Sequence, residues 1–292
     1  MSCSRIVAIA ALTAACHHGH EEVPGDGNNV LDVDASSSDG PNGGDGGTHV
    51  TGGFCVEDDW CWQRPRPFGT TLHAVWGSSP GDVWAVGDGG TIAHYDGSTP
   101  HPGPSYLNAI WGNASNDIWI AYSGGNGGMH YDGHTWQTTI AGPGGDSTAM
   151  HGTATDDIWC VGLAGLMTHF DGGAWSAKPA NTTASLYAVR AFSTTDAWAA
   201  GDAGTLIHWN GSSWQAAQAP PLSGTDVVIN SLAGTSSTDL WAATSGGQIF
   251  HWNGSAWSRS AQLSVSIGSL ARLPSGAMFV AGGNGAILRR GP

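Results

Sequence analysis

Short apolar runs recur from residue 72 to the end of the chain, separated by turns rich in Gly, Asp, Asn and Ser. In the first repeat these runs cover residues 72–77, 82–87 and 91–95, and a Gly-rich turn at 88–90 precedes the third. The apolar residues are nearly continuous rather than alternating. This pattern is typical of short strands that are covered on both faces.

Two sequence elements repeat in phase along this region. The first is Asp-x-Trp, with steps of 35, 40, 39 and 43 residues, and a sixth copy 38 residues further on has Phe279 in the Trp place. The second is His-aromatic-Asp/Asn-Gly, followed three residues later by a further Trp in copies two to five. The Asp-x-Trp pairs are Asp82/Trp84, Asp117/Trp119, Asp157/Trp159, Asp196/Trp198 and Asp239/Trp241, and the histidines are His94, His130, His169, His208 and His251.

Each repeat predicts four short strands, which is the unit of a β-propeller blade. The Asp-Gly or Asn-Gly pair supplies the turn before the fourth strand, because these residues accept a positive φ at low cost. The last repeat stops after its third strand, whereas an isolated Trp-bearing strand lies at 60–63. We therefore expect an all-β, single six-bladed β-propeller of four-stranded blades, in which the N-terminal strand pairs with residues 286–290 and closes the last blade.

These repeats resemble those of bacterial Trp-rich β-propeller lipoproteins, which are loosely related to the kelch, BNR and tectonin repeat groups. The resemblance covers residues 55–292 and implies a propeller fold. In residues 132–136 the spacing from Asp to Trp is one residue shorter than in the Asp-box of BNR proteins. This difference in spacing speaks against carrying over the catalytic residues of sialidases to this chain.

The amino terminus has the form of an export signal. One positive charge, Arg5, precedes an apolar run at 6–15 that is too short to span a bilayer and ends at Ala15-Cys16. Small residues followed by Cys resemble the lipobox of bacterial lipoproteins, although Thr13 stands where that motif usually has Leu; an ordinary cleaved signal is the alternative. The resemblance implies a lipid on Cys16, and His17 after it favours an outer-membrane or cell-surface protein over one retained at the inner membrane.

The predicted organisation is a signal peptide at 1–15, a Gly/Asp/Ser-rich disordered tether at 16–53 and the propeller at 54–292. The tether has no hydrophobic period and cannot bury enough apolar surface to fold. The net charge of −14, with only 9 Lys and Arg in 292 residues, excludes the basic face that a nucleic-acid partner requires. No run of eighteen apolar residues is present, so no ordinary transmembrane helix is expected.

The cysteines suggest two structural roles. Cys55 and Cys61 lie six residues apart in a chain that we expect to be exported, and this favours a disulfide between them. Cys160 follows Trp159 on a predicted strand and is expected to be a buried small apolar residue. No cysteine has zinc-finger spacing.

The repeat histidines and aspartates are expected to be structural. Equivalent positions on the third strands of a six-bladed ring lie about 16–17 Å apart, too far for a common metal ion. Each His is instead expected to bond a group of its own or the next blade, such as the repeat Asp, and each Asp to cap backbone N–H groups at its turn. We expect no metal and no cofactor.

The sequence contains no motif typical of a catalytic site, so no catalytic residue is assigned. We interpret the chain as a non-catalytic, surface-tethered binding propeller that recognises a glycan or a protein partner at one face. The alternatives are a polysaccharide hydrolase or lyase at the channel mouth, and an assembly or scaffolding factor of the cell envelope. The candidate ligand-binding residues lie on the innermost strands or the loops leading into them, and they are Tyr106, Asp146, Tyr187, Arg190, Asp226 and Arg272.

Overall fold

The computed structural model describes residues 55–56, 60–61, 71–79, 82–94, 101–102, 106–123, 127–139, 145–224, 227–273, 275–283 and 286–291. These residues fall in two compact units that divide between Arg66 and Pro67. Residues 1–53, with the proposed signal peptide, Cys16 and the tether, lie outside the described part of the chain. The described residues include no helix that is both long enough and apolar enough to cross a membrane.

Six antiparallel sheets follow one another along the second unit, and each adds its strands in chain order. The first two blades are β3 (Leu72–Ser79), β4 (Asp82–Gly87), β5 (Thr91–His94) and β6 (His101–Pro102), then β7 (Leu107–Ala114), β8 (Asp117–Tyr122), β9 (Gly128–Tyr131) and β10 (Trp136–Thr139). The third and fourth are β11 (Ser147–Ala154), β12 (Asp157–Gly162), β13 (Met167–Phe170) and β14 (Trp175–Ala177), then β15 (Leu186–Ser193), β16 (Asp196–Gly201), β17 (Leu206–Trp209) and β18 (Trp214–Ala216). The last two are β19 (Ile229–Ser236), β20 (Asp239–Thr244), β21 (Gln248–Trp252) and β22 (Trp257–Gln262), then β23 (Ile267–Arg272), β24 (Met278–Gly282) and β25 (Ile287–Arg290).

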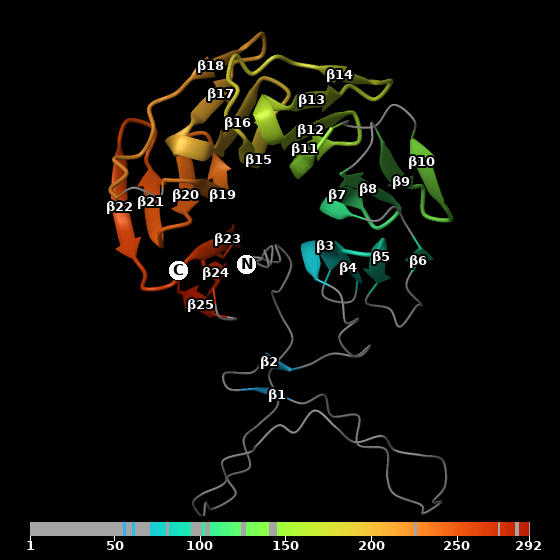
Figure 1. The fold of residues 1–292 in the computed structure, drawn as a ribbon, viewed down its shortest axis with the longest axis horizontal. Coiled ribbons are helices and arrows are strands. Elements are labelled where there is room, and N and C mark those ends of the chain that lie inside the picture. The colour runs from blue at the N-terminus through green and yellow to red at the C-terminus, as the bar shows by residue number, and fades with distance from the viewer. Residues whose placement is uncertain are drawn as a thin grey trace, which may run out of the picture. The chain divides into compact units, whose positions relative to one another are not determined.

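The blades are arranged around a common centre, with β3, β7, β11, β15, β19 and β23 innermost (Figure 1). These six strands contact one another in that order. Two short 3₁₀ turns, Leu163–Gly165 and Asp202–Gly204, connect the second and third strands of their blades. The prediction of an all-β, six-bladed propeller is therefore confirmed.

The predicted closing strand is not tested by the described residues. The last sheet has three strands in the described part of the chain, with β25 at its edge. Trp60 and Cys61 form β2 (Trp60–Cys61), which pairs with β1 (Cys55–Val56). The pairing of β1 with β2 does not test whether this strand also pairs with residues 286–290, so the closure of the last blade stays a prediction, and Trp62 lies outside the described residues.

The β1–β2 pair places Cys55 directly opposite Cys61 in the antiparallel register. Cα atoms in such pairs lie about 4.5–5.5 Å apart, which is within the range that a disulfide spans. The disulfide itself stays a prediction. Cys160 is buried as expected, and its burial raises the pKa of the thiol to about 12.

The predicted turn before the fourth strand is present in four blades. In each, an Asp or Asn side chain accepts hydrogen bonds from the two backbone N–H groups two and three residues further on. The Gly of the pair has a φ of 87° to 91°, which residues with a Cβ rarely adopt. These turn residues are Asp132-Gly133, Asp171-Gly172, Asn210-Gly211 and Asn253-Gly254.

A carboxylate joins the strands within each of the first five blades. The repeat Asp accepts a hydrogen bond from the repeat His of the third strand in all five, with N–O distances from 2.6 to 2.9 Å. The indoles of Trp84, Trp119 and Trp241 donate to the same carboxylates. Each His ring also packs on the blade's Asp-x-Trp indole at centroid distances of 3.8 to 4.4 Å.

The structural role of the five histidines is thus confirmed, with the partner in the same blade. The expectation that the aspartates cap backbone N–H groups needs correction, because their described partners are side chains. Besides His and Trp, the second carboxylate oxygen accepts from a hydroxyl near the end of the first strand, namely Ser78, Thr153 or Thr235. One carboxylate thereby connects three neighbouring strands.

The Asp-x-Trp indoles also form the contacts between blades. Trp84 packs against Tyr131 and Trp136 of the second blade at centroid distances of 5.3 and 5.5 Å. Trp159 packs in the same way against Trp209 and Trp214, at 5.0 and 5.1 Å. The buried apolar residues form five clusters, and each joins two consecutive blades from the first to the last. Within the described residues, none joins the sixth blade to the first.

We predict that the ring loses stability in acid because of these carboxylates. Burial alone raises the pKa of Asp157, but hydrogen bonds from His169 and Thr153 outweigh it, so the pKa lies below the usual 3.8. The pKa of Asp239 is lowered in the same way, and the positive charge of Arg272 lowers it further. A lowered folded-state pKa stabilises the fold above the unfolded pKa of about 4, and this stabilisation disappears as the pH falls through the folded value.

The melting temperature measured from pH 6 down to pH 2 should therefore fall below about pH 4. Asp157→Asn should flatten this decline, since it removes the buried titrating group, and should lower stability at neutral pH. Asp156→Asn, at the exposed neighbouring position, should keep the wild-type profile. An unchanged acid slope in Asp157→Asn would contradict the assignment.

Candidate functional site

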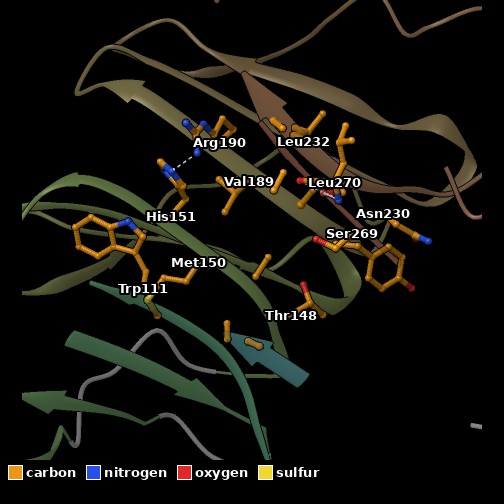
Figure 2. A pocket seen from close by; sticks show the side chains of 18 of the residues that line it. Trp111, Thr148, Met150, His151, Val189, Arg190, Asn230, Leu232, Ser269 and Leu270 are labelled. Atoms are coloured by element: carbon orange, nitrogen blue, oxygen red, sulfur yellow. Dashed lines mark hydrogen bonds between the residues drawn. The ribbon is translucent and has the colours of Figure 1, made fainter. Parts of the chain in front are cut away.

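The innermost strands of all six blades line one cavity of about 630 Å³ at the centre of the ring. This volume lies within the range of small-ligand sites, which are usually concave and mostly apolar with a few polar groups. Its wall consists of successive layers, because equivalent positions of the six strands face the centre at the same depth. The layers differ in chemistry, and Figure 2 shows part of this wall.

A polar layer lies at the beginning of the inner strands. It consists of His73, Asn108, Thr148, Tyr187 and Asn230. Three of these side chains donate to a backbone carbonyl of the next blade: Asn108 to Ser147 O at 3.0 Å, Thr148 to Leu186 O at 2.5 Å and Asn230 to Ile267 O at 2.8 Å. These donors are therefore committed to holding neighbouring blades together.

An aliphatic layer follows two residues further along each strand. It consists of Val75, Ile110, Met150, Val189, Leu232 and Leu270. In Figure 2, Val189 and Met150 lie between the pair Arg190–His151 on one side and Thr148 on the other. A ligand that passes along the channel must contact this apolar layer.

The next position forms a layer in which each side chain reaches toward the following blade. The rings of Trp76 and Trp111 occupy the space that a Cβ on Gly112 or Gly152 would need, with approaches of 2.6 and 2.8 Å. His151 and Arg190 take the same place in the third and fourth blades, and Ala233 and Ala271 in the last two. The six repeats thus provide two indoles, an imidazole, a guanidinium and two methyl groups at one depth.

The guanidinium of Arg190 donates from Nη1 to His151 Nε2 at 2.8 Å and from Nη2 to Gly234 O at 2.9 Å. Arginine cannot accept a hydrogen bond, so His151 Nε2 accepts from it, and the backbone N–H of Ala191 points at the other ring nitrogen, Nδ1, at 3.3 Å. Burial and the neighbouring charge of Arg190 hold the pKa of His151 well below 6.5. The pair therefore carries a single positive charge, with His151 neutral.

Arg272 lines the same cavity but is neutralised. Its Nη1 donates to Asp239 Oδ2 at 2.5 Å and to Thr235 Oγ1 at 3.3 Å. Both partners belong to the preceding blade. Arg272 therefore joins the fifth and sixth blades.

The structure brings together three of the six predicted site residues. Tyr187, Arg190 and Arg272 all line the central cavity, whereas Tyr106 and Asp146 are exposed and are not among the residues of its wall. Asp226 lies outside the described residues. The Tyr187 hydroxyl donates to Asp202 Oδ2 at 3.5 Å.

Sequence reasoning missed His151 and the aliphatic layer. A signal for His151 was present, because alignment of the repeats places it and Arg190 where the first two blades have Trp. No such signal marks the aliphatic layer, since its residues resemble ordinary core positions. Within the described chain, no group of three or more His, Cys, Asp or Glu side chains is placed to hold a metal ion.

Comparisons with known proteins extend to the fold only. No family model matches the chain, and no curated protein matches it. A solved structure of YCF48 bound to D1 peptide has 18% identity and a TM-score of 0.58 over 75% of this chain and 77% of that one. The extracellular domain of a putative one-component system from B. thetaiotaomicron has 16% identity and a TM-score of 0.60, over 75% of this chain and 32% of that one.

A catalytically inactive virginiamycin B lyase from Staphylococcus aureus, solved with quinupristin, has 12% identity and a TM-score of 0.65. The match covers 76% of this chain and 81% of the lyase. At these identities the likeness shows a shared propeller architecture alone.

The geometry at Arg190 predicts how His151 titrates. In an NMR titration the imidazole of His151 should remain neutral well below pH 6.5, since burial and Arg190 both lower its pKa. Arg190→Gln removes the charge and should raise that pKa. A His151 that titrates near pH 6.5 in both proteins would show that the two side chains are not in contact.

Proposed function

We propose that this chain is a non-catalytic binding propeller whose ligand is a protein segment that enters the central channel. The observation that carries this proposal is the aliphatic layer in the middle of a channel wall built by all six blades. Apolar side chains of a protein segment can bury against such a layer, and this burial supplies binding free energy.

The wall favours a protein segment over a glycan. A glycan needs several free hydrogen-bond partners in its site, whereas the side chains of Asn108, Thr148 and Asn230 already donate to neighbouring blades. The solved structure of YCF48 with D1 peptide supports the idea that a propeller of similar architecture takes a peptide. Tyr187, Arg190 and Arg272 are the predicted ligand-binding residues that this proposal retains.

We also propose that Cys16 carries a lipid that anchors the propeller to the outer membrane or cell surface, and that a Cys55–Cys61 disulfide stabilises the segment before the ring. The first proposal rests on the lipobox-like sequence, and the second on the register of β1 and β2. Membrane fractionation of the wild-type chain and of Cys16→Ser tests the anchor. Equal membrane partition of both proteins would refute it.

Selection from a displayed peptide library tests the channel. Peptides selected on the wild-type chain should lose at least about tenfold in affinity toward Val75→Trp, because the indole fills space within the aliphatic layer. Ser258→Trp places the same side chain at an exposed position on β22 and serves as the matched control. It should bind the peptides as the wild type does.

Two results would contradict the proposed function. One is the absence of any specific peptide from the selection. The other is equal binding to the wild-type chain and to Val75→Trp, provided that both have similar melting temperatures.

A further inference from the structure

Arg190 presents a positive charge that the described part of the chain does not balance. Its hydrogen bonds go to two neutral acceptors, His151 Nε2 and Gly234 O. The Nε atom is buried without a hydrogen-bond partner. An arginine keeps its charge at all ordinary pH values, so this charge cannot be removed by loss of a proton.

No carboxylate oxygen of the described residues lies within 4.0 Å of Arg190, whereas Arg272 on the same wall has Asp239. Burial is what lowers the pKa of Arg190, which indicates desolvation of its charge. The Phe192 ring, 5.7 Å from the guanidinium carbon, offers a cation–π contact. Such a contact compensates only part of the cost of removing a charge from water.

The surroundings of Arg190 combine this cation with apolar surface. His151 is neutral because its pKa is low, so it adds no second charge. Val189 and Leu232 of the aliphatic layer lie beside the pair in the channel wall. Tyr187 of the polar layer and Arg190 lie three residues apart on β15, which corresponds to a distance of about 10 Å along the strand.

We propose that Arg190 binds a carboxylate group of the ligand, while the aliphatic layer contacts the apolar part next to that group. The inference rests on the proposed function, because it concerns the same channel. The carboxylate can be an acidic side chain or a chain terminus, since both offer the same oxygen atoms. In either case it accepts charge-assisted hydrogen bonds from the guanidinium.

A carboxylate fits this site better than a phosphate does. Only one unpaired cation faces the cavity among the described residues, whereas a phosphate at pH 7 carries up to two negative charges. The chain as a whole has a net charge of −14, which disfavours a dianion further. The neighbouring aliphatic side chains cannot donate hydrogen bonds to additional phosphate oxygens.

The test uses hexanoate as the probe and hexanamide as its neutral counterpart of the same size. Both are titrated at constant ionic strength into the wild-type chain, Arg190→Gln, Arg190→Lys and Arg259→Gln, while the His151 ring resonances are followed by NMR. Arg259 is an exposed residue of β22, so Arg259→Gln makes the same change in net charge away from the channel. Melting temperatures of all four proteins control for folding.

We expect saturable binding of hexanoate to the wild type and to Arg259→Gln. Hexanamide should bind at least tenfold more weakly, Arg190→Gln should lose hexanoate binding at least tenfold, and Arg190→Lys should retain part of it. If Arg190→Gln does not fold, the comparison of hexanoate with hexanamide on the wild type still tests whether the site binds a carboxylate. Inorganic phosphate should bind at least tenfold more weakly than hexanoate.

The proposal is overturned if hexanoate does not bind, if hexanamide or phosphate binds as tightly, or if a folded Arg190→Gln retains the affinity. If selected peptides bind through the channel but hexanoate does not bind, this inference is overturned and the proposed function still stands. Peptides that bind equally to Val75→Trp would refute the proposed function. If, in addition, hexanoate does not bind to the wild-type chain, both the proposed function and this inference are refuted.

Discussion

The hydrogen-bonded carboxylate of the repeat Asp is the interaction on which the ring depends. In the first five blades it accepts from a His on the third strand, and in several of them also from the Asp-x-Trp indole and from a hydroxyl at the end of the first strand. The His ring in turn packs on that indole. Since the indole contacts the aromatic residues of the next blade, the same carboxylate that joins strands within a blade also orients the contact between blades.

A scaffold of near-identical repeats becomes asymmetric at its centre. The position that carries an indole in the first two blades carries His151 and Arg190 in the third and fourth, and Ala in the last two. The outer Asp–Trp–His contacts do not involve this position, so it can vary without loss of the blade structure. The last blade shows the limit of the repeat: Phe279 replaces the Trp, and Arg290 rather than an aromatic residue lies over Trp241, 5.6 Å from its ring.

Most of the fold was predictable because the repeat presents the same signals six times. The strands, the Asp/Asn-Gly turns and the His–Asp pairs follow from local patterns, and two of the candidate residues, Arg190 and Arg272, line the channel. The pairing of Trp60 was not predictable from pattern alone, because a Trp-bearing strand suits either a blade edge or a local hairpin. The difference between Arg190 and Arg272 was also hidden: it depends on Asp239, which approaches Arg272 only across a blade interface.

A crystal structure of the chain with hexanoate tests most directly whether the channel is the binding site. The account predicts electron density for the carboxylate beside the Arg190 guanidinium, with the hydrocarbon tail against Val189 and Leu232. It is contradicted if the channel contains no hexanoate and Arg190 is paired with a carboxylate of the chain itself. In that case the charge on the wall would serve the fold, and the channel would have no unpaired cation to offer a ligand.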